Sequence, residues 1–279
     1  MGNIAEIFMD RLSKVRYFVL DMDGTIYLGD NVFPFTLDFL SLLRRRGTGF
    51  SFLTNNPTRS VKDYLVKLAG MGIKAGEENV YTSSLAAIDW LRREYPKARR
   101  LFMLGTPSMA EQFAKAGYEA CGDSAEDVPD ALVVAFDPTL TYPRLCRAAW
   151  WAAKGIPYLA TNPDRVCPTE KPTVLVDCGS LQECIAHAVG RRPDVVLGKP
   201  DPRVIYGIMD RYSLRPEEVA VVGDRLYTDI EMARRSGVLG ILVLSGETTP
   251  ETAAREAGED VLVVDDVSCL GKLLEEAGK

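Results

Sequence analysis

Four aspartates in two short segments of the sequence have the chemistry of a metal site. Asp21 and Asp23 lie two residues apart, and Asp224 and Asp229 occur together much later in the chain. Two carboxylates as close as the first pair repel each other, which favours a shared cation or different protonation states. Oxygen ligands without nitrogen or sulfur partners select a hard cation, and Mg²⁺ usually binds through one or two carboxylates plus a substrate phosphate. The pattern therefore indicates a Mg²⁺ site.

Two other residues fit a phosphate group beside such an ion. Lys199 offers a positive charge and Thr54 a hydroxyl donor, and both suit the oxygens of a phosphate dianion. A carboxylate such as Asp21 can accept a phosphoryl group, which splits hydrolysis into two easier steps. A second carboxylate can protonate the leaving oxygen and then deprotonate the attacking water. The chain has one histidine, so this acid–base role falls to Asp23.

Each of these motifs also has an ordinary structural explanation. An Asp-x-Asp-Gly segment is usually a turn or a solvated loop, and a lysine before a proline is normally a surface residue. The chemical interpretation is favoured because the motifs occur in order along the chain, and because each follows a segment with the pattern of a strand.

Short apolar runs alternate with segments of helical periodicity. Runs that are apolar throughout indicate strands buried on both faces, and strands separated by helices indicate an α/β fold with a parallel, doubly wound sheet. The predicted strands are Tyr17–Leu20, Phe50–Leu53, Leu101–Leu104, Ala131–Ala135, Pro157–Ala160, Val174–Val176, Val195–Leu197, Val219–Val222 and Ile241–Leu244. The predicted helices are Leu37–Arg46, Lys62–Gly70, Leu85–Arg93, Met109–Ala116, Pro143–Lys154, Pro202–Tyr212 and Thr228–Ser236.

Polar residues come just after the ends of four of these strands. They are Asp21, Thr54, Lys199 and Asp224. In open parallel sheets, ligands bind beyond the carboxyl ends of the strands. We therefore expect the four side chains to meet in one crevice.

The composition limits the classes of partner. The 279 residues carry a net charge of −6, which argues against general nucleic-acid binding and against attachment to an anionic membrane surface. No apolar stretch approaches the ~20 residues of a membrane span, and the N-terminus lacks the apolar run of a signal peptide. The six cysteines form no C-x-x-C pair, so we expect reduced thiols in a cytoplasmic protein.

The ordered motifs resemble those of the haloacid dehalogenase (HAD) superfamily of phosphatases. The matching motifs are Asp21-Met22-Asp23-Gly24-Thr25, Thr54, Lys199, and Gly223-Asp224 with Asp229. Within the superfamily the chain looks like the NagD-like, para-nitrophenyl phosphatase group. The segments that carry this resemblance are Asp23-Gly24-Thr25-Ile26-Tyr27, Thr54-Asn55-Asn56, Thr161-Asn162-Pro163-Asp164, Gly198-Lys199-Pro200 and 223–229. The resemblance covers nearly the whole chain. It implies a Mg²⁺-dependent hydrolase of phosphate monoesters that acts through an aspartyl-phosphate.

The resemblance also implies a role for each matching residue. Asp21 would be the nucleophile and a Mg²⁺ ligand, and Asp23 would be the general acid–base and offer its backbone carbonyl to the metal. Asp224 would bind the metal directly or through water. Asp229 would support Asp224 without binding the metal itself. The residues that would hold the phosphoryl oxygens are Thr54, Asn55 through its backbone, and Lys199.

The spacing of the motifs predicts an inserted domain. Asp21 and Thr54 leave room for one helix and one strand, whereas the interval from Thr54 to Lys199 is far longer and contains its own predicted elements. Compact folds rarely carry long structureless loops, so we expect an α/β cap there. In the superfamily a cap at this place is called type C2. We predict a core of residues 1–82 and 187–279 and a cap of residues 83–186.

Three cap residues are candidates for substrate contacts. Asp137, Asn162 and Asp177 each follow an apolar run, as residues of a cleft-facing loop would, although Asn-Pro-Asp is also an ordinary turn sequence. The expected substrate is a small phosphorylated metabolite rather than a nucleic-acid polymer. A homodimer is a further expectation.

Three other functions are compatible with the same fold. A dehalogenase of this superfamily needs no metal and typically lacks the second aspartate, so Asp23 and Asp224 argue against one. A phosphomutase usually carries its cap between the first two motifs, where this chain has no room. A non-catalytic binding protein would not need the intact acidic set together with Lys199.

Overall fold

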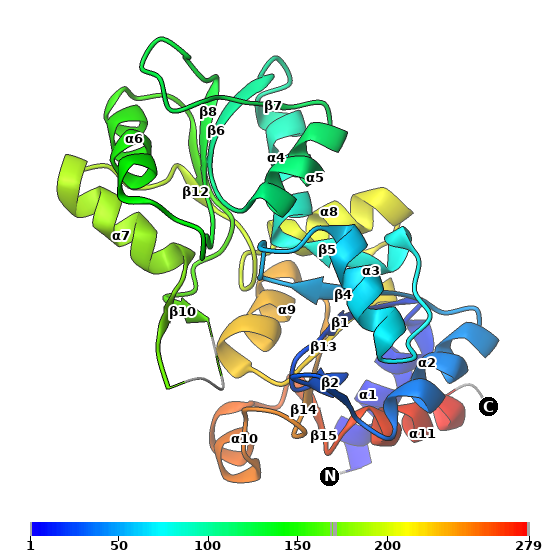
Figure 1. Ribbon diagram of the computed structural model, residues 1–279. Coiled ribbons are helices and arrows are strands. Elements are labelled where there is room, and N and C mark those ends of the chain that lie inside the picture. Colours follow the sequence, from blue (N-terminus) through cyan, green and yellow to red (C-terminus); the bar gives the residue numbers. More distant parts are fainter. Residues whose placement is uncertain (1, 168, 170–171, 278–279) are drawn as a thin grey trace. The chain divides into compact units, whose positions relative to one another are not determined.

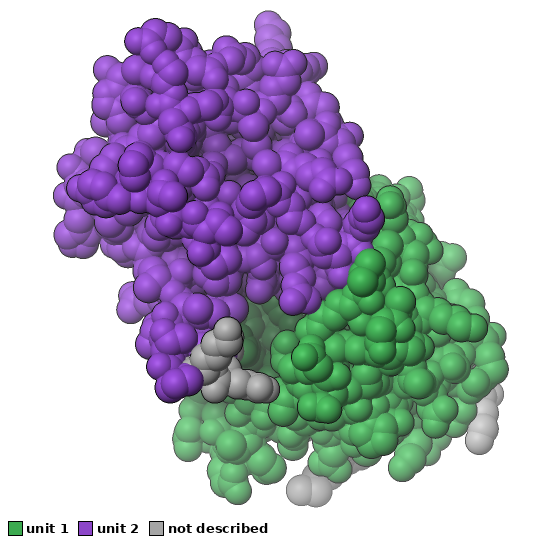
Figure 2. All heavy atoms as spheres, viewed as in Figure 1, with its two compact units in different colours: residues 1–53, 65–80, 199–279 green, residues 54–64, 81–198 purple. Residues whose placement is uncertain are grey.

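Two compact units make up the part of the chain that the computed structural model describes, residues 2–167, 169 and 172–277 (Figure 1). The first unit combines segments 1–53, 65–80 and 199–279, and the second combines segments 54–64 and 81–198. Figure 2 shows the two units in different colours. The second unit therefore lies, in sequence, inside the first.

A six-stranded sheet forms the centre of the first unit, in the order β15-β14-β13-β1-β4-β5. Its strands are β1 (Tyr17–Asp21), β4 (Gly49–Thr54), β5 (Val80–Thr82), β13 (Val219–Gly223), β14 (Leu239–Val243) and β15 (Val261–Val264). The pairings from β15 through β13 and β1 to β4 are parallel. Every residue of β13 and β14 is buried, as expected for strands that are covered on both faces.

Helices and short turns precede, connect and follow these strands. They are α1 (Gly2–Lys14), α2 (Thr36–Arg45), α3 (Val61–Gly70), η1 (Glu77–Asn79), α8 (Arg203–Tyr212), η2 (Pro216–Glu218), η3 (Leu226–Ile230), α9 (Glu231–Ser236), α10 (Pro250–Glu256) and α11 (Val267–Ala277). A small hairpin, β2 (Tyr27–Leu28) with β3 (Asn31–Val32), follows β1. Helix α11 packs against α1 and α2, and α8 packs against α9.

The strand order reverses direction at β1. From β1 the chain continues to β4 on one side, and it later returns to β13 on the other side. Such a switch point opens a crevice at the carboxyl ends of the two strands that flank it. Because Leu20 of β1 lies opposite Val222 of β13, the residues that follow these two strands emerge side by side.

The second unit contains its own parallel sheet, in the order β12-β9-β8-β6-β7. The strands are β6 (Arg100–Leu104), β7 (Glu119–Ala120), β8 (Ala131–Val134), β9 (Tyr158–Ala160) and β12 (Val195–Val196). The helices are α4 (Ser83–Glu94), α5 (Pro107–Lys115), α6 (Tyr142–Ala153) and α7 (Cys178–Val189), and a two-stranded hairpin joins β10 (Val166–Cys167) to β11 (Leu175–Val176).

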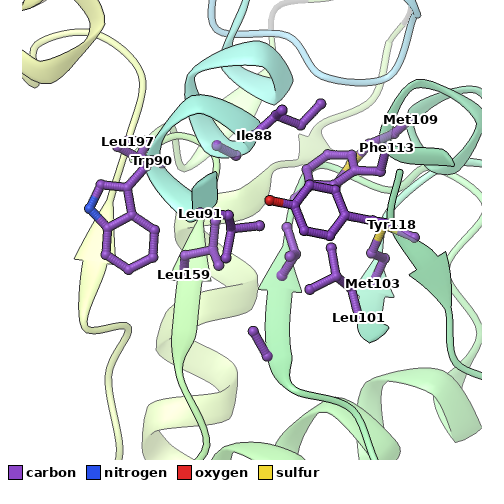
Figure 3. Packing of buried hydrophobic residues seen from close by; sticks show 14 of the residues in the cluster. Ile88, Trp90, Leu91, Leu101, Met103, Met109, Phe113, Tyr118, Leu159 and Leu197 are labelled. Carbon is purple, nitrogen blue, oxygen red and sulfur yellow. The ribbon is translucent and has the colours of Figure 1, made fainter. Parts of the chain in front are cut away.

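The second unit also has a separate hydrophobic core. Trp90 and Leu91 of α4 and Phe113 of α5 pack against Leu101 of β6 and Leu159 of β9 in one buried cluster (Figure 3). Burial of aromatic and aliphatic side chains on this scale stabilises a sheet and its helices as a folding unit. The inserted segment is therefore a domain with a core of its own.

The predicted α/β class, with a parallel core sheet and an inserted α/β cap, is confirmed, and the sheet of the cap is parallel as well. One strand expectation is wrong: Val174–Val176 does not form a buried parallel strand. Its last two residues form β11, which pairs antiparallel with β10, and both Val174 and Val176 are exposed. A two-stranded hairpin offers no second layer to cover those side chains. No helix within the described residues is long and apolar enough to cross a membrane.

The burial of β4, which lies between β1 and β5 in the sheet, generates a stability prediction. Phe52 is fully buried, and the centroid of its ring lies 5.5 Å from the centroid of the Phe50 ring. Changing Phe52 to Ala should lower the free energy of unfolding by about 3–5 kcal/mol, because the lost contacts leave a cavity. Urea denaturation followed by circular dichroism measures this loss. The matched control is Val66→Ala on α3, where the side chain is exposed and the change should stay within about 0.5 kcal/mol. A loss below about 1 kcal/mol for Phe52→Ala would contradict the packing described for β4.

Candidate active site

Asp21 and Asp224 lie on either side of the switch point. Asp21 is the last residue of β1, and Asp224 directly follows β13, the parallel neighbour of β1. Both strands are apolar up to these residues, so the sheet supplies a rigid, buried base for the two carboxylates. Asp224 is almost fully buried, whereas the side chain of Asp21 is 12% exposed. Asp21 therefore remains open to a small molecule at the strand end.

Asp229 reaches the same place through a π-helical turn. The turn η3 follows Asp224 and leads into α9. The carboxylate of Asp229 lies so close to Gly223 that a Cβ on residue 223 would overlap it. Wide turns of this kind are rare and occur frequently at functional sites. The glycine of the Gly-Asp pair is therefore explained by space for Asp229.

Lys199 connects two of the three carboxylates. Its ammonium group donates to Asp21 Oδ1 and to Asp229 Oδ1, the latter at 2.7 Å. Burial acts to lower the pKa of Lys199, but attraction to the two carboxylates outweighs it and raises that pKa. The lysine is therefore a fixed positive charge beside Asp21 at every ordinary pH.

The three aspartates can bind a metal ion. Each of Asp21, Asp224 and Asp229 offers a carboxylate oxygen, and these oxygens lie within 4.8 Å of one another. Asp224 Oδ1 is buried and has no hydrogen-bond partner in the described part of the chain. A buried carboxylate oxygen without a donor is costly, and a cation would satisfy it. An all-oxygen donor set of this kind fits Mg²⁺.

The proximity of these carboxylates changes their acidity. Burial raises the pKa of Asp21 from 3.8 to about 7, Lys199 opposes the rise, and the neighbouring Asp229 and Asp224 add to it. Burial, together with repulsion from Asp229, also raises the pKa of Asp224, while the N–H of Glu247 opposes the rise. A bound divalent cation would lower both pKa values, because it adds positive charge at the same point.

Asp23 is not part of the carboxylate cluster formed by Asp21, Asp224 and Asp229. Its side chain is exposed, and Oδ1 accepts a hydrogen bond from the N–H of Gly29 at 3.1 Å. Backbone bonds between Met22 and residues 25–27 fold this segment into a tight turn. The acid–base role and the carbonyl–metal contact expected for Asp23 stay predictions.

Thr54 and Asn55 continue directly from β4. Thr54 is the last residue of that strand, and its neighbour Leu53 is paired with Asp21 of β1. The Thr54 hydroxyl accepts a hydrogen bond from the N–H of Asn56 at 3.1 Å. The Asn55 carbonyl accepts one from the Ser83 hydroxyl at 2.8 Å. The loop is therefore ordered by a hydrogen bond of its own and by one from Ser83 of α4, and phosphate binding by Thr54 and Asn55 stays a prediction.

The three cap candidates are held inside the second unit. Asp137 is buried and pairs with Arg144 at 2.8 Å, and it also accepts from the N–H of Thr139 at 2.9 Å. Asn162 is fully buried, and its amide donates to Asp177 at 3.0 Å. Burial raises the pKa of Asp177 to about 6, against the hydrogen bonds it accepts. All three order cap loops, and their contact with substrate stays a prediction.

Sequence reasoning missed the loop that follows β14. This loop, Ser245-Gly246-Glu247-Thr248, supports the backbone and carboxylate of Asp224 through its own N–H and hydroxyl groups. A signal was present, because Ile241–Leu244 was predicted as a strand and the loop comes at its carboxyl end. Sequence reasoning looked for aspartate pairs or a lysine after each predicted strand. The loop after β14 has neither, so it was not predicted to be part of the site.

Comparisons with known proteins give a consistent result. Residues 18–119 match a family model described as haloacid dehalogenase-like hydrolase, and residues 196–270 match one described as HAD-hydrolase-like. The ribonucleotide monophosphatase NagD of Escherichia coli is 30% identical over 233 residues, which cover 83% of this chain and 88% of that protein.

Solved structures of relatives are similar to this chain over nearly its whole length. A 4-nitrophenylphosphatase from Thermotoga maritima is 38% identical, with a TM-score of 0.87 and coverage of 94% of this chain and 98% of that one. A glycerol phosphate phosphatase from Mycobacterium tuberculosis, solved in complex with magnesium, is 30% identical, with a TM-score of 0.84 and coverage of 94% and 78%. The similarity therefore includes both units.

The raised pKa of Asp21 predicts how stability depends on pH in chelator. The folded protein holds the Asp21 proton up to about pH 7, whereas the unfolded chain releases it near pH 4. Stability contributed by this proton is therefore lost as the pH rises from about 4 to about 7. Lys199 does not contribute to the change of stability between pH 4 and pH 7, because its ordinary pKa of 10.5 already lies above this range.

Replacing Asp21 by Asn removes this dependence. The Tm of Asp21→Asn minus that of the wild type should increase by at least about 2 °C between pH 5 and pH 8 in chelator. Differential scanning calorimetry measures it, with Asp30→Asn, an exposed position, as the matched control. An equal Tm difference at both pH values would show that the pKa of Asp21 is not raised.

Proposed function

This chain belongs to the haloacid dehalogenase-like hydrolase family, and from that premise we propose that Asp21 attacks the phosphorus of a small phosphate monoester. The chain is a phosphatase of the HAD type, a phosphoric monoester hydrolase. The observation that carries the proposal is the Asp21 carboxylate, which is partly exposed at a strand end and contacted by the Lys199 ammonium. A nucleophile needs this combination of access and fixed orientation.

The reaction would proceed in two steps. Asp21 forms a bond to phosphorus while the bond to the leaving oxygen breaks, and Asp23 gives that oxygen a proton. Asp23 then takes a proton from water, which attacks the phosphorus of the aspartyl-phosphate, releases phosphate and regenerates Asp21. Lys199, Thr54 and the backbone of Asn55 would hold the phosphoryl oxygens, and the short path from β4 to Asn55 supports this.

We assign Mg²⁺ to the aspartates at the end of β1 and β13. Asp21, Asp224 and the carbonyl of Asp23 would be its protein ligands, and the relative solved with magnesium supports the choice of ion. Bound Mg²⁺ would neutralise charge on the carboxylates and polarise the phosphoryl group. Asp229 gives one oxygen to Lys199, which supports the assisting role proposed for it.

The second unit would act as the C2-type cap that selects the substrate. Strand β12 pairs with β9 of the cap sheet, so we propose that the cap extends to Gly198 rather than ending at residue 186, and that it begins near residue 81. Relatives are named for ribonucleotides, acid sugars, glycerol phosphate and phosphoglycolate. The substrate class is therefore a small phosphorylated metabolite, and side chains of the cap would decide which one.

Two further properties are proposals from the sequence. A cytoplasmic location is proposed because the six cysteines form no C-x-x-C pair, which favours reduced thiols. A homodimer is testable by light scattering, which should give twice the chain mass of 30.8 kDa; a single-chain mass would exclude it. A phosphomutase or a non-catalytic binding protein remains the alternative if no phosphate is released.

Removing the nucleophile tests the proposal. Asp21→Asn preserves the shape of the side chain and should lower kcat for para-nitrophenyl phosphate at least about a thousandfold, because amide nitrogen and oxygen are poor nucleophiles toward phosphorus. The release of nitrophenolate measures this loss. Asp30→Asn, an exposed aspartate nearby in sequence, should keep wild-type activity. Residual activity above about one thousandth would mean that Asp21 forms no covalent intermediate.

The same assay includes a metal arm. Excess chelator should abolish wild-type activity, and added Mg²⁺ should restore it. Activity that is insensitive to chelator would contradict the metal assignment while leaving the role of Asp21 intact.

A further inference from the structure

The loop 245–248, which follows β14, binds Asp224 through three donors. The N–H of Glu247 donates to Asp224 Oδ2 at 2.7 Å. The N–H of Thr248 donates to the Asp224 carbonyl at 3.2 Å, and the Thr248 hydroxyl donates to the same oxygen at 2.5 Å. The loop therefore fixes both the backbone of Asp224 and one of its carboxylate oxygens.

The other carboxylate oxygen is left for a ligand. Asp224 Oδ1 is buried and has no hydrogen-bond partner among the residues that the structure describes. If the carboxylate turned over, Oδ1 would receive the N–H of Glu247 and Oδ2 would be the unpaired atom, so what matters is that one oxygen is always occupied. The Glu247 N–H thus makes Asp224 a ligand through a single oxygen.

Gly246 provides the space for this arrangement. A Cβ on residue 246 would overlap Asp224 Oδ2 and the carboxylate carbon. Any side chain there would push the Asp224 carboxylate away from the N–H of Glu247. The neighbouring Ser245 hydroxyl donates to the carbonyl of Gly24 at 2.7 Å, so the same loop also contacts the first motif.

The side chain of Glu247 anchors the loop to the fourth motif. Its carboxylate accepts a hydrogen bond from the hydroxyl of Tyr227 at 2.8 Å and lies 2.9 Å from Nε of Arg225. Arg225 and Tyr227 follow Asp224 in sequence, so the loop and the motif hold each other at several points. Loss of a group that holds a metal ligand by a hydrogen bond typically lowers metal affinity by about 10–100-fold.

We propose that Gly246 and the N–H of Glu247 are positioning elements for Asp224, which set the affinity of the site for Mg²⁺. The proposal rests on the proposed function, because it takes Asp224 as a metal ligand. Both residues lie against the carboxylate of Asp224, so their effect on the metal acts through that ligand.

The rise of Tm with Mg²⁺ concentration measures the affinity without any substrate. Gly246→Ala should weaken Mg²⁺ binding by about tenfold or more. The matched control is Gly70→Ala at the end of α3, where nothing lies within 4 Å of an added Cβ, and its affinity should equal that of the wild type. Asp224→Asn reports the loss expected when the ligand itself is removed.

A second variant covers the case in which Gly246→Ala does not fold. Thr248→Val removes one hydroxyl from the Asp224 carbonyl and keeps the shape of the side chain, so it should weaken Mg²⁺ binding severalfold. The Tm of each variant in chelator measures any purely structural damage, which would lower that value without changing the Mg²⁺ dependence.

The outcomes separate this inference from the proposed function. If Asp224→Asn loses Mg²⁺ binding while both Gly246→Ala and Thr248→Val bind like the wild type, the positioning role is refuted and the metal site stands. If Asp224→Asn binds Mg²⁺ as tightly as the wild type, the metal assignment is refuted and the positioning role with it. Loss of binding in Asp224→Asn and Gly246→Ala, but not in Gly70→Ala, supports both.

Discussion

Repulsion between three carboxylates at the end of β1 and β13 is the constraint on which this structure depends. Oxygens of Asp21, Asp224 and Asp229 lie within 4.8 Å of one another. Two unit charges about 4 Å apart interact by about 4 kcal/mol at an effective dielectric constant of about 20. One lysine ammonium, that of Lys199, contacts two of them and leaves an excess of negative charge. The cluster is therefore poised for a divalent cation and for the phosphate that such a cation attracts.

The fold holds these charges together by rigid elements. The parallel pairing of β1 with β13 fixes the separation of Asp21 and Asp224, and the π-helical turn η3 brings Asp229 back to the same point. The loop 245–248 then restrains Asp224 through backbone N–H groups and the Thr248 hydroxyl, which carry no charge and therefore do not compete with a cation. A cluster of charges that is costly in isolation is in this way held in place by rigid elements at the carboxyl ends of the strands.

The sequence predicts most of the core and only part of the site. The apolar runs ending at Asp21, Thr54 and Asp224 are strands, because side-chain pattern and burial on both faces are local properties of a run. The hydrogen bonds from residues 245–248 to Asp224 depend on packing between segments that lie more than twenty residues apart in the chain. The prediction of a buried strand at Val174–Val176 is wrong for the same reason. The apolar residues of this run do not show whether another layer of the fold covers them, and in the structure they form part of an exposed hairpin.

Trapping the covalent intermediate tests the central claim most directly. The enzyme would be mixed with substrate and Mg²⁺, quenched within one turnover and reduced with borohydride, which converts an aspartyl-phosphate to homoserine. Peptide mass spectrometry then locates the modified residue. Homoserine at position 21, with Asp23, Asp224 and Asp229 unchanged, is the result predicted by nucleophilic attack from Asp21. Homoserine at another position, or release of phosphate with no modified residue, would contradict it.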